Sequence, residues 1–123
     1  PAEYGLSWML PKIVGLGRAN DLLLTSRVFT SDEAYELGFV NALFEPEALL
    51  TETYAYVQNM ISTVSPNSLR QTRWQIYRDL HRDVASSVIE SETLLNQMMG
   101  EPDYAEGISA FVEKRAPDWP SLK

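Results

Sequence analysis

The stretch LLLTSRVFTSDEAYELGFVN, residues 22–41, determines how the N-terminal part of this chain folds. Thr30-Ser-Asp-Glu33 matches a capping box, in which the Thr30 hydroxyl accepts the backbone N–H of Glu33 and the Glu33 carboxylate reaches back to the N-cap. We therefore expect a helix that begins at Ser31. It should stop at Gly38, because glycine readily adopts the left-handed conformation that ends many helices.

Apolar segments flank this helix on both sides. Residues 5–14 have apolar side chains at helical spacing, although Pro11 should break that helix or restart it. Residues 18–26 are rich in good helix formers and predict a second helix. Residues 39–44, FVNALF, predict a short strand. Residues 1–44 are therefore expected to form a small α/β region.

The remainder, residues 45–123, is expected to be helical. Apolar residues recur at helical spacing from Pro46 to Val64 with no turn signal, which predicts one long amphipathic helix. Ser65 as N-cap and Pro66 at the first helical position then open the next helix.

Two more helices are expected near the C-terminus. The first runs from about Asp83 to Met99 and ends at Gly100. The second begins near Asp103, where Asp103 and Glu106 are predicted to form a capping pair. The fold class is therefore mainly α.

Composition excludes several classes of function. The chain has 123 residues and no cysteine, which excludes disulfides, thiolate metal sites and a cysteine nucleophile, and we expect no metal site. Its net charge of -7 would repel nucleic acid and anionic lipid, so neither is an expected partner. No apolar run is long enough to span a membrane and no targeting segment is recognisable, which leads us to expect a cytoplasmic protein.

The charged residues of this chain are seldom spaced in a way that indicates a catalytic site. His81, the only histidine, lies at a predicted helix end, where a cation is ordinary. Glu90 and Glu92 point to different faces of a helix, so they cannot form a catalytic dyad and are expected to be solvated. The sequence Glu-Lys-Arg at 113–115 is typical of a helix end. By spacing alone, none of these residues is a strong catalytic candidate.

Glu3 is harder to dismiss. It precedes Tyr4 and Gly5 and an apolar segment that contains Trp8, so its carboxylate could face a poorly solvated cleft. A carboxyl group in such a cleft can exchange protons near neutral pH. The competing interpretation is an exposed glutamate with no chemical role.

Three segments, taken in order, carry a resemblance to a known family. These are AEYGLSWMLPKIVGLG (2–17), the stretch at 22–41, and EGISAFVEKR (106–115). Together they resemble the C-terminal half of the enoyl-CoA hydratase/isomerase family, the crotonase superfamily. The resemblance implies the C-terminal part of a crotonase-like (ClpP/crotonase) α/β spiral fold: residues 1–44 would end the spiral core and include the active-site-side helix, and residues 45–123 would form a helical trimerisation region.

The resemblance also implies roles for particular residues. Glu3 matches a catalytic carboxylate of the family, although Ala2 stands where the family commonly has proline. Tyr4, Leu6, Trp8 and Met9 would line the acyl pocket, with core packing as the competing explanation. Phe111 and Lys114 would contact coenzyme A, often at the site of a neighbouring subunit. Coenzyme A would be part of the substrate, and no separate cofactor is implied.

We therefore expect the C-terminal portion of a longer enzyme of fatty acid metabolism, a hydratase or an isomerase acting on acyl-CoA or enoyl-CoA. The family's oxyanion-hole donors and first catalytic glutamate would lie upstream of Pro1, so this portion alone should be inactive. Homo-oligomers, trimers or hexamers, are implied as the assembly. The alternative is a non-catalytic helical oligomerisation module.

Overall fold

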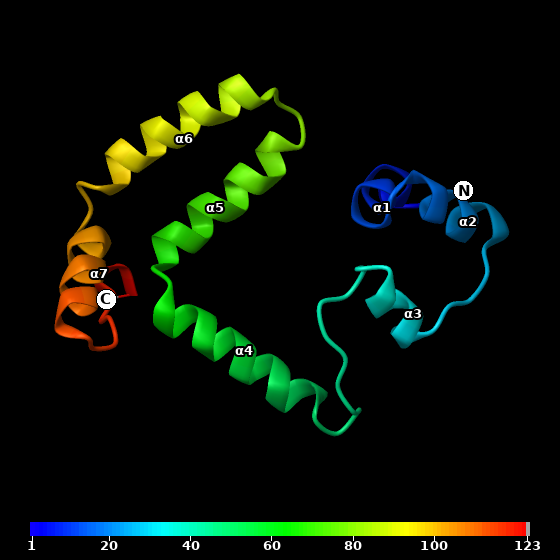
Figure 1. The fold of residues 1–123 in the computed structure, drawn as a ribbon, viewed down its shortest axis with the longest axis horizontal. Helices are drawn as coiled ribbons and strands as arrows, with labels where there is room; N and C mark the ends of the chain where they lie inside the picture. The colour runs from blue at the N-terminus through cyan, green and yellow to red at the C-terminus, as the bar shows by residue number, and fades with distance from the viewer. Residues whose placement is uncertain (123) are drawn as a thin grey trace. The chain divides into compact units, whose positions relative to one another are not determined.

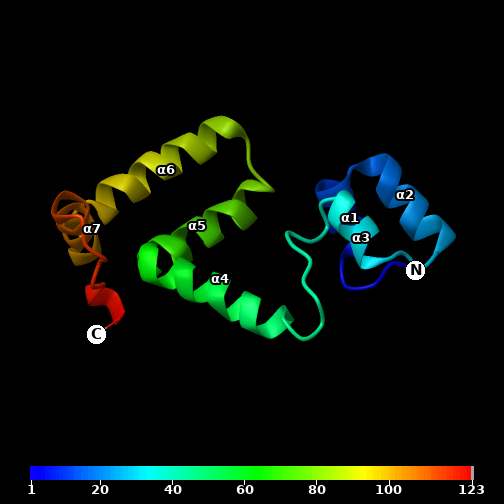
Figure 2. The ribbon, with the colours of Figure 1, turned by 60° about the horizontal axis from the view of Figure 1, so that its bottom comes forward.

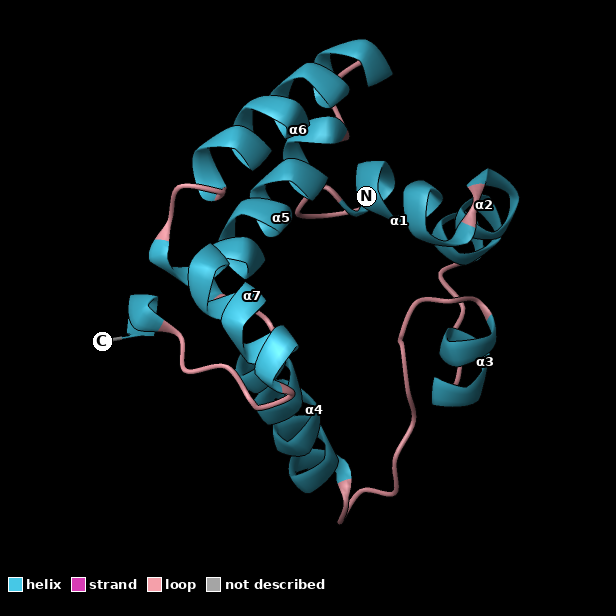
Figure 3. Cartoon of the chain, turned by 60° about the vertical axis from the view of Figure 1, so that its left-hand side comes forward, coloured by secondary structure: helices cyan, strands magenta, loops and turns pink. Residues whose placement is uncertain are grey.

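The computed structural model describes residues 1–122, and within that range every regular element is helical (Figure 1 and Figure 3). The chain divides into two compact units, Pro1–Glu52 and a unit that begins at Thr53. The helices are α1 (Leu6–Val14), α2 (Leu16–Thr25), α3 (Ser31–Glu36), α4 (Leu49–Thr63), α5 (Pro66–Asp79), α6 (Val84–Met98), α7 (Pro102–Glu113) and the short 3-10 helix η1 (Pro120–Leu122).

The first unit has a small apolar core between α1 and α2. Leu10 and Val14 of α1 are buried with Ala19 and Leu22 of α2. The α1 helix continues through Pro11, so the predicted break is wrong. Burial of residues on both sides of Pro11 offsets the backbone hydrogen bond that proline cannot donate.

The N-terminus of α3 forms largely as predicted. The helix begins at Ser31, and the Glu33 N–H donates to Thr30 Oγ1 at 3.3 Å. The predicted role of the Glu33 carboxylate is wrong: it accepts hydrogen bonds from the Arg27 guanidinium, with Nη1 2.9 Å from Oε2. These bonds hold the pKa of Glu33 below its usual range. A paired guanidinium is a stronger donor than the neutral N–H of the N-cap, which explains the difference.

The strand predicted at 39–44 is wrong, and no strand occurs anywhere in residues 1–122. Gly38 has φ 73°, as expected for a residue that ends a helix. The N–H groups of Phe39 and Val40 then bond back to the Ala34 carbonyl at 2.8 and 3.4 Å. A strand needs a neighbouring strand to take such N–H groups, and here the end of α3 takes them instead.

In the second unit, α5 and α6 lie side by side (Figure 2). Arg78 of α5 and Arg82, in the turn between α5 and α6, both form ion pairs with Glu90 of α6, so the prediction of a solvated Glu90 is wrong. Gln75 Nε2 donates to Ser91 Oγ at 3.1 Å and adds a second link between these helices. Polar groups therefore define how α5 and α6 pair.

The N-terminus of α5 is capped as predicted, but that of α7 is not. Ser65 Oγ accepts the Ser68 N–H at 3.2 Å, with Pro66 in the first turn. At α7 the N-cap is Glu101, without a side-chain cap. Asp103 is buried instead of capping, because it accepts hydrogen bonds from outside its own helix.

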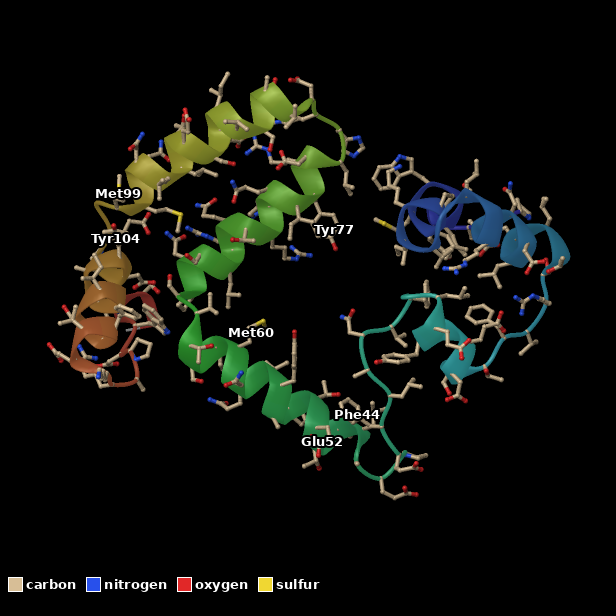
Figure 4. The ribbon with its side chains drawn as sticks, in the orientation of Figure 1. Phe44, Glu52, Met60, Tyr77, Met99 and Tyr104 are labelled. Atoms are coloured by element: carbon tan, nitrogen blue, oxygen red, sulfur yellow. The ribbon has the colours of Figure 1, made fainter. Side chains whose placement is uncertain are left out.

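Helices α4, α5 and α6 contain no buried residue. Most of their apolar side chains are exposed, as are several on α7; Tyr77 on α5 and Tyr104 on α7 are labelled in Figure 4. Exposed apolar area of this kind is typical of a surface that another protein surface covers. The exposed apolar residues of these four helices are Leu49, Leu50, Tyr54, Tyr56, Val57, Ile61, Trp74, Ile76, Tyr77, Val84, Val88, Ile89, Leu95, Tyr104, Ile108, Phe111 and Val112.

Candidate functional site

The predicted catalytic Glu3 lies on a turn immediately before α1. Its backbone carbonyl accepts the Leu6 N–H at 3.0 Å, and its side chain is exposed. Gly5, the N-cap of α1, has φ 79° and gives the helix no side-chain cap. The turn thus holds the Glu3 backbone beside the first turn of α1, and its carboxylate is exposed in this chain, not in the poorly solvated cleft that the sequence suggested.

Tyr4, next to Glu3, has a backbone conformation that tyrosine seldom adopts. Its φ is 52°, in the left-handed region, and its side chain is fully exposed at 102%. A left-handed non-glycine residue is strained, and such residues cluster at functional sites. Among residues 1–122, none packs on the Tyr4 ring to compensate for that strain.

The other predicted pocket residues lie on α1. Leu6 and Trp8 are each 40% exposed and Met9 is partly buried, while Leu10 faces the core. The Lys12 ammonium lies 3.9 Å from the centroid of the Trp8 ring, a cation–π contact. The structure therefore groups Glu3, Tyr4, Leu6, Trp8 and Met9 on one segment, with an apolar surface next to a carboxylate.

Phe111 and Lys114, the predicted coenzyme A residues, lie in the second unit at the end of α7. Phe111 is 83% exposed and lines a hollow of about 450 Å³ together with Tyr104, Ile108, Met98 and Trp119. Lys114 is the C-cap of α7 with φ 54°, and its side chain is exposed. An apolar ring and a cation thus project from neighbouring turns of one helix end.

Arg115 and Glu106 form an ion-pair cluster that the sequence analysis missed. Arg115 Nη1 and Nη2 lie 2.6 and 3.0 Å from the two carboxylate oxygens of Glu106, and Arg115 Nε lies 2.6 Å from Glu113. The Asp118 N–H also donates to Glu106, at 2.7 Å. The two carboxylates raise the pKa of Arg115. No periodic signal reveals this cluster, because Arg115 folds back along α7 after the helix has ended.

Asp103 forms a second polar cluster, and this one is buried. Only 5% exposed, it accepts Ser65 Oγ at 2.7 Å, Ser121 Oγ at 2.6 Å and the Ser121 N–H at 3.0 Å. Burial alone would raise the pKa of Asp103, but the hydrogen bonds from Ser121 and Ser65 outweigh it and lower the pKa below its usual value. The cluster joins the N-termini of α5 and α7 to the C-terminal segment.

Residues 1–122 contain neither of two other kinds of site. No group of three or more His, Cys, Asp or Glu side chains there is arranged to hold a metal ion. In the same range, no helix has the length and apolar content that crossing a membrane requires.

Comparisons with known proteins agree with the resemblance seen in the sequence. A family model described as "Enoyl-CoA hydratase/isomerase" matches residues 1–122. A probable enoyl-CoA hydratase of Mycobacterium bovis is 30% identical over 115 residues, which cover 94% of this chain and 44% of that protein. A crotonyl-CoA hydratase of Syntrophomonas wolfei is 30% identical over 112 residues, with 91% and 43% covered.

Solved structures give the same result for the fold. The crystal structure of a probable enoyl-CoA hydratase/isomerase from Mycobacterium abscessus matches with a TM-score of 0.91 at 27% identity, covering 94% of this chain and 47% of that one. The chain therefore spans less than half the length of the relatives and the solved structure that it matches.

Proposed function

Because this chain belongs to the enoyl-CoA hydratase/isomerase family, we propose that it is the C-terminal portion of an enzyme that acts on acyl-CoA thioesters. The observation that carries this proposal is the family match over residues 1–122 by a chain that covers only 44% of a curated relative. The reaction is acid/base proton transfer with stabilisation of an enolate, in a hydratase or an isomerase.

Glu3 is proposed as an acid/base group of that reaction. In hydration, the oxygen of water adds to carbon 3 of the enoyl group and a proton is added at carbon 2, while the thioester carbonyl takes up the developing negative charge. In isomerisation, a carboxylate moves a proton between carbons 2 and 4. Support for either role comes from the family match over this segment and from the apolar Leu6 and Trp8 that follow Glu3 in it. The Glu3 carboxylate is exposed in this chain, so the poorly solvated setting that suits proton transfer would have to come from the rest of the enzyme.

Phe111 and Lys114 are proposed to bind coenzyme A, with the ammonium facing a phosphate and the ring covering apolar parts of the ligand. Their exposure at the end of α7 supports this proposal. The exposed apolar faces of α4 to α6 likewise support a homo-oligomer, a trimer or hexamer, as their covering. A cytoplasmic location stays a prediction from the sequence.

The proposal requires groups that this chain does not supply. An enolate needs hydrogen-bond donors at the thioester oxygen, and losing one such donor costs about 10²–10³ in rate. By the resemblance these donors lie upstream of Pro1. The chain alone should therefore not hydrate an enoyl-CoA, and activity should require the upstream half.

The first test is the intact mass of the protein isolated from its source, followed by hydration of crotonyl-CoA. A mass well above 13.9 kDa, with activity that Glu3→Gln abolishes, supports the proposal. Glu47→Gln is the matched control, because Glu47 is an exposed glutamate in the loop before α4. An active enzyme with unchanged rate in Glu3→Gln would refute the role of Glu3.

One observation also favours the alternative, a non-catalytic helical oligomerisation module. Helices α4, α5 and α6 bury none of their own residues, as expected of an element whose purpose is to associate. A polypeptide mass of 13.9 kDa for the protein isolated from its source, assembly of that polypeptide into a defined oligomer, and no activity towards enoyl-CoA would establish the module and exclude the enzyme.

A further inference from the structure

We infer that Glu106 and Arg115 position Lys114 for a phosphate group of coenzyme A. This inference rests on the proposed function, in which Lys114 contacts the ligand. Glu106 and Arg115 are positioning residues here, because they act on the ligand only through Lys114.

The backbone at Lys114 needs support to keep its conformation. Lys114 has φ 54°, a left-handed value that glycine adopts far more easily than lysine. Its N–H bonds to the Phe111 carbonyl at 3.4 Å, and the Arg115 N–H bonds to the Ala110 carbonyl at 3.1 Å. These two bonds close the end of α7 at Lys114.

The Arg115 side chain supplies that support. Its guanidinium folds back along α7 and makes a two-point contact with the Glu106 carboxylate, at 2.6 and 3.0 Å. Glu106 also accepts the Asp118 N–H at 2.7 Å. One partly buried carboxylate on α7 therefore fixes the chain directly after Lys114 and again at Asp118.

The two neighbouring cations at the end of α7, Lys114 and Arg115, differ in their acidic partners. Arg115 is matched by two carboxylates, those of Glu106 and Glu113. Lys114, in contrast, is exposed and has no acidic partner among the residues that the structure describes. Of the two neighbouring cations, Lys114 is therefore the one available to an anion, while Arg115 holds the backbone.

The experiment measures coenzyme A binding by isothermal titration calorimetry in the full-length protein that carries this chain. Lys114→Ala should weaken binding by about tenfold, the effect of one charge-assisted contact. Glu106→Gln should weaken binding by several-fold, although it removes a negative charge. A purely electrostatic role for Glu106 predicts the opposite sign, since removing a carboxylate would strengthen binding of an anion.

The double variant Glu106→Gln with Lys114→Ala tests whether Glu106 affects coenzyme A binding through Lys114. If Glu106 acts through Lys114, the double variant binds no more weakly than Lys114→Ala alone. Losses that add, or unchanged or tighter binding in Glu106→Gln, would overturn the inference. No effect of Lys114→Ala would refute the proposed contact itself, and the inference with it.

Two further variants and a measurement of helix content distinguish loss of positioning from misfolding. Arg115→Lys keeps the charge but loses the two-point contact, so it should weaken binding like Glu106→Gln. Glu113→Gln is the matched control, because Glu113 makes only one hydrogen bond to Arg115 and is more exposed than Glu106. Circular dichroism should show the same helix content in all variants that are compared. Full affinity in a folded Arg115→Lys variant would also overturn the inference.

Discussion

Replacing Asp103 with asparagine should destabilise the second unit, and the loss should depend on pH. The carboxylate is 5% exposed and accepts hydrogen bonds from Ser65 Oγ, Ser121 Oγ and the Ser121 N–H. Asparagine keeps one acceptor oxygen but cannot be ionised. The NH₂ group of the asparagine amide is itself a donor. It would face serine groups that donate hydrogen bonds to the carboxylate in the native protein.

The size of the effect follows from these contacts. A hydrogen bond to an ionised group contributes about 1.5–3 kcal/mol to net stability. The contributions within one cluster are not additive, and the serine hydroxyls can rotate to accept from an amide, so we expect a loss of about 2 kcal/mol in the free energy of unfolding near neutral pH.

The pH dependence has a definite sign. The pKa of Asp103 in the folded chain is lowered from its ordinary value of 3.8. A lowered pKa means that the carboxylate stabilises the fold above the ordinary value, and that this contribution is lost as the pH falls through the lower folded value. The stability gap between the native protein and Asp103→Asn should therefore be full at neutral pH and shrink in acid.

Urea unfolding followed by circular dichroism at about pH 7, and at acid values down to about pH 3, measures this gap. Glu92→Gln, an exposed position on α6, is the control and should leave the free energy of unfolding unchanged. A gap of equal size at every pH would show that the charge of Asp103 contributes nothing. No gap at neutral pH would refute the stabilising role of the cluster.

Three further changes test other parts of the fold. Leu10→Ala should lower the free energy of unfolding of the first unit by about 3 kcal/mol, measured by urea unfolding, because Leu10 is 4% exposed at the contact between α1 and α2. Gly38→Ala should lower it by about 1 kcal/mol through backbone strain alone, since φ is 73° and an added Cβ meets no atom within 4 Å; equal stability would contradict the left-handed turn. Glu90→Gln should reduce the thermal midpoint of the second unit by a few degrees, because both Arg78 and Arg82 lose an ionised partner, and an unchanged midpoint would mean that these pairs add nothing.

Helix caps whose two partners lie only a few residues apart could be predicted from the sequence. The predicted N-caps at Thr30 and Ser65 both form. Asp83, from about which a helix was predicted to run, is the N-cap of α6 and accepts the Ser86 N–H at 3.0 Å. In each case the partner lies three residues away, so the local sequence contains the whole interaction. The pKa of Asp83 is lowered, with the hydrogen bond from the Ser86 hydroxyl as the main cause.

Interactions between distant residues were not predicted. Asp103 resembles a local cap in the sequence, yet its partner Ser65 is 38 positions away. The apolar residues at 39–44 have the composition of a strand, but composition does not specify a neighbouring strand. The candidate site shows the same division. Glu3 and Lys114 are predicted as site residues only through a family resemblance, whereas the link from Glu106 to Arg115 becomes visible only in the folded backbone.

The uncovered helices α4, α5 and α6 also predict a calorimetric behaviour. The heat-capacity change of unfolding scales with the apolar surface that unfolding exposes, and these helices already expose most of theirs. As a monomer, this part of the chain should melt broadly with a small heat-capacity increment. When a partner surface covers the helices, the transition should sharpen, the increment should grow, and the melting temperature should rise with protein concentration.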